Sequence, residues 1–466
     1  MSDYYFIGIG GIGMSGLARF LCANGHAVAG YDRTETALTS ILLAEGMDVC
    51  AGQSAEVALD HFNAWVQSAE HGDAVIVRTP AISPGFPVLI AAQATGIPIV
   101  KRSELLGSLT RNTPTLAVAG THGKTTTSAI LTHLLLAEPG GCRGFLGGIL
   151  TEQQSNVVWS GNAEWTVVEA DEFDRSFLHL HPTHAVITSA DPDHLDIYGD
   201  AESFLEGLRD FAKGVKGALW MEAHVAIPGL NGKRYGCVEE PAAAVQLDAA
   251  AIRPRVRDGW VVADVVLQGT CHPNVRFPLP GNHNVLNALA ALALAMEAGA
   301  DPDRCLTRLA QFKGIERRFT YHVRTPHGVF IDDYAHHPAE LEAAIQAARL
   351  HHPQREITGI FQPHLFSRTR DHLAAFGRVL AQLDRVFLLP IYPAREAPIP
   401  GIDSQTLFEN IPNPRKHLIE SHQIFDNLKD HPPEVLMTLG AGDIDKCVKP
   451  LADWLQEDPK RFKPSS

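Results

Sequence analysis

A strand–turn–helix signature at residues 115–127 constrains this chain more than any other stretch. Its sequence TLAVAGTHGKTTT joins a β-compatible run, Thr115 to Ala119, to a glycine-rich turn, a lysine and three threonines. Residues 128–137 predict the helix that follows, which stops before Pro139. Such a turn directs backbone N–H groups at a phosphate chain, and the helix dipole favours the same anion. The stretch therefore predicts a phosphate-binding loop.

The loop has the residues that such a site needs, although it is shorter than the common Walker A pattern. Lys124 is placed to reach the β- and γ-phosphates of a nucleotide, and Thr125 is placed to ligate Mg²⁺. Val118 stands where the longer pattern has glycine. The alternative is an ordinary turn between strand and helix that carries a surface lysine.

Length and charge limit the classes of protein to consider. A chain of 466 residues suggests about three domains. The net charge of −14 argues against a nucleic-acid binder, which usually has a basic face. No apolar run approaches the roughly 20 residues that span a bilayer, and no signal peptide is visible, so we expect no membrane insertion. The seven scattered cysteines fit a reducing cytoplasm.

The N-terminal stretch reads as a nucleotide-binding unit. A strand from Tyr4 leads into the glycine pattern at residues 8–13, a helix is predicted over 15–23, and Asp32 follows a second strand. The distance from the last glycine to Asp32 is that of a Rossmann unit, which predicts a nucleotide diphosphate at the helix N-terminus. NAD and a UDP-sugar both fit, and a tight turn without a ligand is the alternative. A later loop at residues 79–84 follows another strand, where ligands of open α/β sheets bind.

The middle of the chain offers candidates for a metal site. A strand over residues 165–168 delivers Glu169 to its carboxyl end, and the next strand leads into the segment DPDHLD with His194. Carboxylates beside a phosphate loop suit Mg²⁺. The glycine turn at residues 145–148 is expected to face the substrate. For any one of these polar residues, a solvated loop position is the alternative.

Two asparagines open a later helix. Asn284 and Asn287 lie three residues apart, on one face of its first turn, where they could contact a base or a ribose. A plain helix cap is the alternative for one of them. Beyond residue 314 the chain alternates strands and helices again, and arginines and histidines gather at the strand ends, which suits a carboxylate or phosphate ligand.

Nine segments, in one order along nearly the whole chain, resemble the Mur ligase family of peptidoglycan synthesis. They are GIGGIGMSGLA, AGTHGKTTTSAIL, EADEFDRSFL, DPDHLDIYG, GNHNVLNALAA, GIERRF, DDYAHHPAEL, QPHLFSRTRD and LGAGDI. The resemblance implies an α/β fold of three domains: a Rossmann-like domain for the UDP-sugar at residues 1–110, a central P-loop ATPase with a mixed or parallel sheet at 111–314, and a Rossmann-like domain at 315–466 that closes over ATP and the amino acid.

The resemblance also implies the reaction. Within the family, the segments are most similar to those of enzymes that use ATP and Mg²⁺ to join L-alanine to the lactyl carboxylate of UDP-N-acetylmuramate through an acyl phosphate. A ligase that recycles a murein tripeptide is the alternative in the same family. A nicotinamide-dependent dehydrogenase and a nucleotide-binding regulator without turnover are alternatives of other classes. Whether the protein is a monomer or a dimer stays open.

The resemblance implies roles for individual residues. Those expected at ATP are Gly120, Thr121, His122, Gly123, Lys124, Thr125, Thr126, Asn284, Asn287, Arg318 and Asp333. Those expected at the metal are Thr125, Glu169 and His194. Those expected at the UDP-sugar or the amino acid are Gly10, Gly11, Ile12, Gly13, Asp32, Thr79, Ala81, Ile82, Gly147, Gly148, Tyr334, His336 and Arg368. The catalytic set is Lys124, Glu169, His194, Asp333 and His336, with His336 as the candidate base for the amine.

Two positions depart from the family pattern. The segment before DPDH reads Thr188-Ser-Ala190 where Thr-Asn-Ile is frequent, and Leu365 stands where an arginine is frequent. The second departure lies beside the residues expected to hold the amino acid, so it bears on the choice of amino acid and leaves the ATP residues unaffected.

Overall fold

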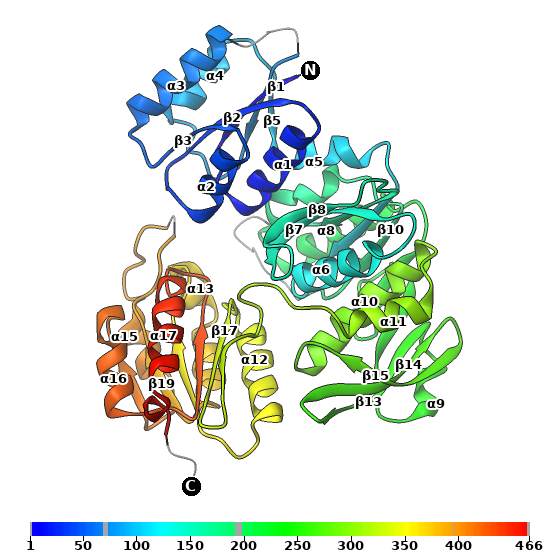
Figure 1. Cartoon of the computed structure of the whole chain (residues 1–466), viewed down its shortest axis with the longest axis vertical. Helices are drawn as coiled ribbons and strands as arrows, with labels where there is room; N and C mark the ends of the chain where they lie inside the picture. Colours follow the sequence, from blue (N-terminus) through cyan, green and yellow to red (C-terminus); the bar gives the residue numbers. More distant parts are fainter. Residues whose placement is uncertain (1, 69–72, 192–197, 395, 464–466) are drawn as a thin grey trace. The chain divides into compact units, whose positions relative to one another are not determined.

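A computed structural model of the chain describes residues 2–68, 73–191, 198–394 and 396–463, and it contains three β-sheets with helices packed on them (Figure 1). The predicted α/β class with three domains is confirmed. By its internal contacts the chain divides into two compact units. The first comprises Met1–Arg253, Asp264–Val275 and Leu286–Lys313, and the second comprises Pro254–Ala263, Arg276–Val285 and Gly314–Ser466. The domain boundaries at residues 110 and 314 stay predictions.

The N-terminal sheet has five parallel strands in the order β3-β2-β1-β4-β5. Its strands are β1 (Asp3–Ile7), β2 (Ala27–Asp32), β3 (Asp48–Ala51), β4 (Val75–Arg78) and β5 (Ile99–Lys101), and its helices are α1 (Ile12–Ala23), α2 (Ala37–Ala44), α3 (Ala55–Ser68), α4 (Pro87–Ala94) and α5 (Arg102–Thr110). Helices α3 and α4 pack on the face that carries Tyr5 and Ile7, and α1, α2 and α5 pack on the face that carries Phe6. This alternation along β1 shows that both faces of the sheet are covered.

The middle sheet has ten strands in the order β15-β14-β13-β12-β11-β10-β6-β9-β7-β8. Its strands are β6 (Thr115–Ala119), β7 (Cys142–Leu150), β8 (Ser155–Trp159), β9 (Trp165–Glu169), β10 (His184–Ile187), β11 (Leu219–Glu222), β12 (Lys233–Val238), β13 (Ala249–Arg257), β14 (Trp260–Leu267) and β15 (Thr270–Phe277). Its helices are α6 (Lys124–Leu135), η1 (Phe173–His179), α8 (Ala201–Lys213), α9 (Pro241–Ala244), α10 (Asn282–Glu297) and α11 (Pro302–Leu309). Strand β6 lies between β9 and β10, and all three are parallel, so their carboxyl ends share one edge.

The C-terminal sheet has six strands in the order β16-β17-β21-β18-β19-β20, and only β16 is antiparallel to its neighbour. Its strands are β16 (Thr320–Arg324), β17 (Val329–Asp333), β18 (Ile357–Phe361), β19 (Arg385–Leu388), β20 (Lys416–Leu418) and β21 (Val435–Leu439). Its helices are α12 (Pro338–His351), α13 (Phe366–Asp371), α14 (Leu373–Leu380), α15 (Ser404–Glu409), η2 (Ser421–Gln423), α16 (Ile424–Asp430), α17 (Asp445–Glu457) and η3 (Pro459–Arg461). Successive residues of β17 alternate between two apolar cores, one on each face.

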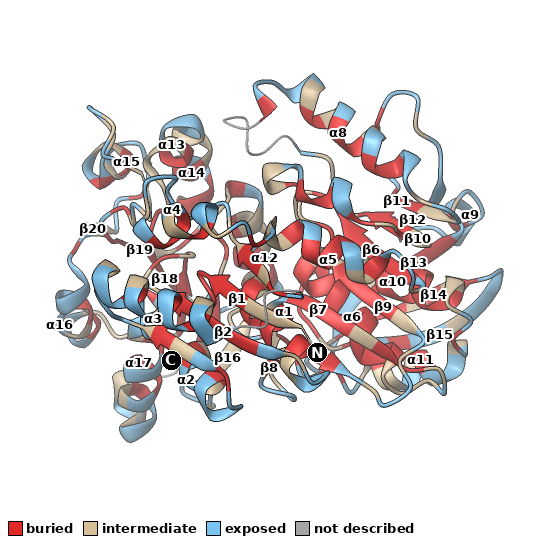
Figure 2. Ribbon diagram, turned by 90° about the horizontal axis from the view of Figure 1, so that it is seen from above, coloured by how far each residue is buried: buried red, intermediate tan, exposed pale blue. Residues whose placement is uncertain are grey.

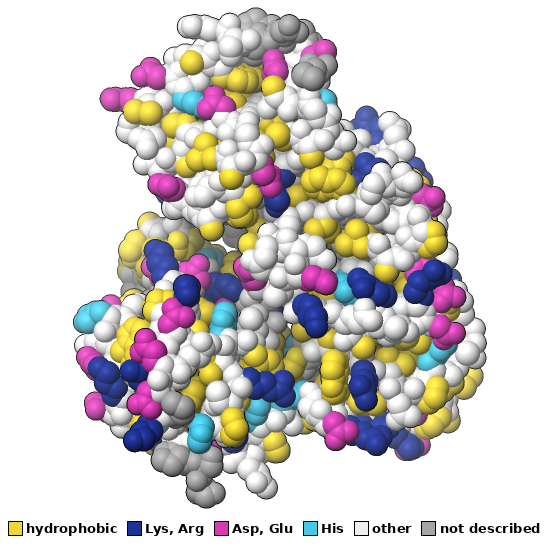
Figure 3. All heavy atoms as spheres, in the orientation of Figure 1, with side chains coloured by type: hydrophobic (Ala, Val, Ile, Leu, Met, Phe, Trp, Pro, Cys, Tyr) yellow, Lys and Arg dark blue, Asp and Glu magenta, His cyan; other side chains and the backbone are white. Residues whose placement is uncertain are grey.

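Burial follows this layering. The central strands β6, β17, β18 and β21 are buried throughout, whereas the outward faces of the covering helices are exposed (Figure 2). On the face drawn in Figure 3, Lys and Arg side chains are interspersed with Asp and Glu. Among the residues that the structure describes, no helix combines the length and the apolar character needed to cross a bilayer.

Candidate functional site

The predicted phosphate loop connects β6 to α6, and two of its glycines are required by their surroundings. Gly120 has φ +117° and Gly123 has φ +83°, a region that side chains disfavour. A Cβ atom on Gly120 would lie 2.7 Å from the backbone nitrogen of Ser189, and one on Gly123 would lie 2.3 Å from Oδ1 of Asn287. The turn therefore closes tightly between β10 and α10.

The end of β10 holds the loop from one side. The amide of His122 donates a 2.7 Å hydrogen bond to Oγ of Ser189, and the hydroxyl of Thr188 donates to the carbonyl of His122. The hydroxyl of Thr121 donates to the carbonyl of Asp191. These bonds fix the loop backbone from outside the loop itself, which preorganises it for a ligand.

Lys124 begins α6, and its side chain folds back over the loop. Its ammonium donates to the carbonyl oxygens of Gly120 and Thr121, at 2.7 and 3.2 Å, and lies 2.7 Å from a carboxylate oxygen of Glu172. Burial acts to lower the pKa of Lys124, but the nearby carboxylates, that of Glu172 foremost, raise it above its usual value. The lysine is therefore positively charged at neutral pH and poised to meet an anion.

Two of the predicted metal ligands meet beside this lysine. The hydroxyl of Thr125 donates a 3.0 Å hydrogen bond to one carboxylate oxygen of Glu169, and the amide of Gly147 donates a 3.0 Å bond to the other. A Cβ atom on Gly147 would lie 2.4 Å from that carboxylate, so any larger residue there would displace the Glu169 side chain. A hydroxyl and a carboxylate are oxygen donors of the kind that Mg²⁺ prefers. His194, the third predicted ligand, lies outside the described residues.

No cluster of three or more His, Cys, Asp or Glu side chains with metal-binding geometry occurs among the described residues. The donor pair formed by Thr125 and Glu169 fits a Mg²⁺ ion that keeps several waters or takes phosphate oxygens as its other ligands. The pair is therefore compatible with a metal that arrives with the nucleotide.

The two predicted asparagines differ in their surroundings, although both lie in the first turns of α10. Asn287 is 8% exposed and accepts a hydrogen bond from the hydroxyl of Thr127 at 3.4 Å, directly against Gly123. Asn284 donates a 2.7 Å bond to the carbonyl of Pro280, which ties down the entry to the helix. Asn287 thus supports the turn of the phosphate loop, and the predicted contacts of both side chains with the nucleotide stay predictions.

The N-terminal glycine turn brings together its own predicted residues. Gly10 donates its amide to Oδ2 of Asp32 at 2.9 Å, so this carboxylate closes the turn at the end of β1. A Cβ atom on Gly8 would meet the methyl group of Thr79 at 2.8 Å and the side chain of Ile82 at 3.7 Å. The loop after β4, to which Ala81 also belongs, therefore lies against the turn. Gly11 precedes α1, Ile12 and Gly13 are the first residues of that helix, and Gly148 lies in β7; their contacts with a substrate stay predictions.

In the second unit, the predicted ATP residues Arg318 and Asp333 lie close together. Burial raises the pKa of Asp333 to about 6, while the guanidinium of Arg318 and two backbone hydrogen bonds act to lower it. Those bonds come from the amides of Phe319 and Ala335, both at 2.8 Å. The guanidinium of Arg318 lies 5.3 Å from the ring centroid of Tyr334. The end of β17 thus holds a carboxylate and a guanidinium close together, each in contact with neighbouring groups.

The residues expected at the amino acid begin with Tyr334, directly after Asp333. The ring of Tyr334 lies 5.3 Å from that of His336, and the ring of His336 lies 5.9 Å from that of His364. Arg368 is 9% exposed and approaches Nδ1 of His364 at 3.4 Å, while the ring of Tyr392 stacks on that of His364 with the ring centroids 5.8 Å apart. Burial lowers the pKa of His336, so this imidazole is neutral at neutral pH and able to accept a proton.

Three residues of these clusters were not predicted from the sequence. Glu172 is one residue of the EADE segment whose first glutamate was predicted, and its pairing with Lys124 depends on a fold of the loop that a sequence pattern does not reveal. His364 and Tyr392 follow the ends of β18 and β19, where ligands of parallel sheets gather. Their positions after the carboxyl ends of two parallel strands are the sequence feature from which both residues could have been predicted.

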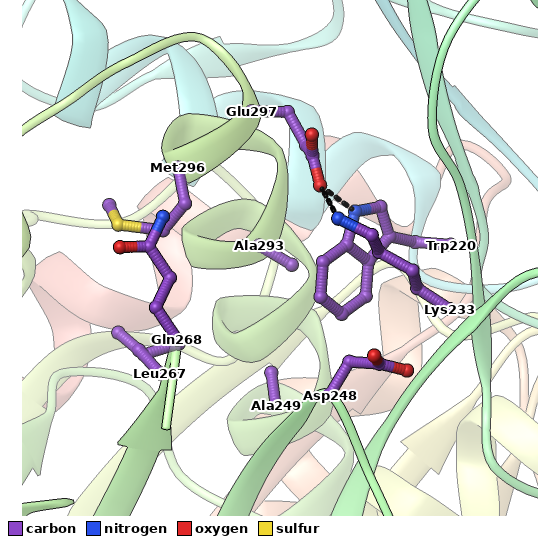
Figure 4. Close-up of a pocket in the computed structure, with 9 residues that line it drawn as sticks. All are labelled: Trp220, Lys233, Asp248, Ala249, Leu267, Gln268, Ala293, Met296 and Glu297. Carbon is purple, nitrogen blue, oxygen red and sulfur yellow. Dashed lines mark hydrogen bonds and ion pairs between the residues drawn. The ribbon is translucent and has the colours of Figure 1, made fainter. Parts of the chain in front are cut away.

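A small cavity lies apart from these residues in the first unit (Figure 4). It has a volume of about 200 Å³ and lies between α10 and strands of the middle sheet. Oε1 of Glu297 accepts hydrogen bonds from Lys233 at 2.6 Å and from the indole of Trp220 at 3.1 Å. Three of its polar side chains, those of Trp220, Lys233 and Glu297, thus bond to one another, and none of the predicted site residues lines the cavity.

Three family models match the chain, one after another. The model described as the Mur ligase family, catalytic domain, matches residues 3–113. The Mur ligase middle domain matches residues 118–295, and the Mur ligase, glutamate ligase domain matches residues 317–444.

Full-length relatives agree with these models. A UDP-N-acetylmuramate–L-alanine ligase of Christiangramia forsetii is 44% identical over 451 residues, which cover 96% of each chain. A crystal structure of a UDP-N-acetylmuramate–alanine ligase from Thermotoga maritima has a TM-score of 0.80 and 26% identity, and covers 98% of this chain and 99% of that one. A murein peptide ligase from Psychrobacter arcticus, with a TM-score of 0.69, 20% identity and the same coverage, shares the fold.

Proposed function

This chain belongs to the Mur ligase family, which is ATP-dependent, and from that premise we propose that it joins L-alanine to the lactyl carboxylate of UDP-N-acetylmuramate. The observation that carries the proposal is the 44% identity, over 96% of both chains, to an L-alanine ligase. The geometry of the phosphate loop supports it, because Lys124, Thr125 and Glu169 converge where a nucleotide would bind.

The first step activates a poor electrophile. A carboxylate oxygen of the sugar attacks the γ-phosphorus of ATP, an O–P bond forms, and the bond to the β-phosphate oxygen breaks to release ADP. The product is an acyl phosphate. Lys124 and the backbone amides of the loop hold the phosphate chain in place and neutralise charge that develops on the transferring group.

Thr125 and Glu169 would hold Mg²⁺ in this site. The ion would supply charge neutralisation at the β- and γ-phosphates. The support from this chain is the 3.0 Å contact between the Thr125 hydroxyl and the Glu169 carboxylate, together with the 3.0 Å hydrogen bond that the amide of Gly147 donates to the other carboxylate oxygen.

The second step forms the amide. The amine of alanine attacks the acyl carbon, a tetrahedral intermediate forms, and inorganic phosphate leaves. The amine must lose a proton, and we assign that proton to His336, because burial keeps its imidazole neutral. Its Nδ1 lies 3.3 Å from a carboxylate oxygen of Glu340, which would stabilise the imidazolium that results. We assign the carboxylate of alanine to the nearby Arg368.

The test is the release of phosphate from ATP by the purified chain. Release is expected only when UDP-N-acetylmuramate and L-alanine are both present, and mass spectrometry of the sugar product should show the added alanine. Glycine and L-serine, each in place of L-alanine, would measure the selectivity. Phosphate release at the same rate with and without L-alanine would contradict the proposal.

A ligase for a murein tripeptide is the second candidate, because a murein peptide ligase shares this fold at a TM-score of 0.69. In the same assay, it would release phosphate with UDP-N-acetylmuramate and a tripeptide together and would not respond to L-alanine. The two outcomes exclude one another.

A further inference from the structure

The contact between Lys124 and Glu172 leaves the loop lysine without a spare donor. Its ammonium has three N–H groups, and three acceptors surround it: two loop carbonyl oxygens and the carboxylate of Glu172, whose oxygens lie 2.7 and 2.8 Å away. The Glu172 residue is 2% exposed. A phosphate oxygen can bind this ammonium only if one of these acceptors gives way.

Glu172 itself is held in place by its neighbours in the loop after β9. Its carbonyl accepts a 2.8 Å hydrogen bond from the hydroxyl of the buried Tyr198. Asp174, two residues later, pairs with Lys101 at 2.8 Å, and Asp171, the residue before, lies 3.7 Å from Arg102. The backbone segment that carries Glu172 is therefore held in place by these contacts. The side chain of Lys124 has four rotatable bonds, so we expect the lysine to be the partner that moves.

The charges of the three acceptors indicate which of them a phosphate oxygen replaces at the ammonium of Lys124. Two neutral carbonyl oxygens can stay beside a phosphate at little cost, but the anionic carboxylate of Glu172 would face the like charge of the phosphates. Buried charges interact more strongly than exposed ones, so this repulsion is not screened away. The carboxylate is the acceptor that the phosphate displaces.

We infer that Glu172 is a positioning residue that acts as the resting counter-ion of Lys124, and that a nucleotide binds by taking its place. The inference rests on the proposed use of Lys124 to hold the phosphates of ATP. Glu172 orients the ammonium when no nucleotide is bound, and it opposes the binding of any phosphate that fails to displace it. It thereby sets the affinity of the loop for nucleotides.

The test measures nucleotide binding directly. Glu172→Gln keeps the shape and an acceptor oxygen but removes the charge, so calorimetric titration with ADP, without and with Mg²⁺, should show binding that is on the order of tenfold tighter than in the wild type. Glu172→Asp keeps the charge on a shorter side chain and should lie between the two. Tyr198→Phe loosens the same segment but leaves the charge, so it should not tighten binding.

The opposite outcomes overturn the inference. Unchanged or weaker ADP binding by a folded Glu172→Gln variant would show that Glu172 only supports the structure. If that variant does not fold, a crystal structure of the wild type with a non-hydrolysable ATP analogue decides: Lys124 should lie on phosphate oxygens and beyond 4 Å from Glu172, and retention of the contact would refute the exchange. These measurements need neither UDP-N-acetylmuramate nor L-alanine, so they stand apart from the test of the proposed reaction.

Discussion

At the scale of single residues, the shape of the phosphate loop and its surroundings depends on three glycines. Gly120, Gly123 and Gly147 each lie where a Cβ atom would come within 3 Å of a neighbouring polar atom. Such contacts are closer than van der Waals distance, so even alanine would move the neighbour. A residue with no side chain is thus as specific a requirement here as the charged residues around it.

Gly147→Ala should disturb the proposed metal site without touching the nucleotide loop. The new methyl group would lie 2.4 Å from Oε2 of Glu169 and would push this carboxylate from its place beside Thr125. We expect the Mg²⁺ concentration for half-maximal turnover to rise by about tenfold or more. Gly161→Ala is the matched control, because no atom lies within 4 Å of the methyl group there. An equal response of the two variants would contradict the assignment of Glu169.

Lys124→Ala should reduce turnover by at least about 100-fold, because the transferring phosphoryl group loses its cation. Calorimetric binding of UDP-N-acetylmuramate should remain near that of the wild type, since the glycine turn after β1 is unchanged. The exposed Lys213, which pairs with Asp210 on its own helix, provides the control substitution. Loss of the sugar-nucleotide binding in Lys124→Ala would refute the division of roles proposed between the two sites.

At the scale of elements, the sequence predicted the strands well and the helix starts less well. Strand β6 occupies the predicted residues Thr115 to Ala119, and β9 covers the strand predicted at residues 165–168. Helix α1 begins at Ile12 rather than Ser15, and α6 begins at Lys124 rather than Ser128. In both cases the glycine turn passes directly into the helix, so the residues read as a loop form its first turn.

The candidate site was predictable where a residue follows a strand, and less so where contacts join distant segments. Thr125 follows β6 and Glu169 ends β9, so the sequence places each at the carboxyl end of a strand, but the pairing of β6 with β9 does not follow from sequence order because β7 and β8 lie between them in the chain. The partner of Lys124 could not be predicted in this way, because Glu172 lies three residues beyond the end of β9, in an irregular segment where Asp174 and Arg175 adopt φ of 53° and 54°. Backbone conformations of this kind leave no periodic pattern in the sequence from which they could be predicted.

That segment forms an ion pair with a residue of the N-terminal sheet. Lys101, at the end of β5, holds Asp174 at 2.8 Å, and both side chains are about one-third exposed. Lys101→Ala should therefore cost only roughly 0.5 kcal/mol of stability but should loosen residues 171–177. Hydrogen exchange of that peptide is expected to accelerate, while Lys213→Ala leaves it unchanged. Equal exchange in both variants would show that the segment holds its shape without this pair.

At the scale of the whole molecule, several histidines of the second unit are kept neutral by burial. The pKa values of His283 and His352 are lowered to about 4, chiefly by burial. Unfolding returns such residues to a pKa near 6.5, so the unfolded chain binds more protons below that pH. Their contribution to stability is present above pH 6.5 and is lost as the pH falls toward 4. Asp333, with its pKa raised to about 6, acts in the opposite direction in this range.

His352→Phe should flatten the dependence of stability on pH. Each histidine that is neutral when folded and charged when unfolded contributes a slope of about 1.4 kcal/mol per pH unit between its two pKa values. Urea unfolding of the wild type at pH 6.5, 5.5 and 4.5 should show a steeper loss of stability than unfolding of the variant. His224→Phe, at a side chain that is 88% exposed, is the control. Parallel curves for wild type and His352→Phe would contradict this explanation.

The buried pair of Lys124 and Glu172 also bears on the design of inhibitors. A compound that imitates the phosphates of ATP must first separate an ammonium from a carboxylate that are 2.7 Å apart and shielded from water, so part of its attraction is offset before it binds. A neutral compound that accepts hydrogen bonds from the backbone amides of the loop and leaves the pair intact avoids that penalty. Uncharged scaffolds are therefore the more promising starting points against this loop, and they also cross membranes more readily than phosphate analogues do.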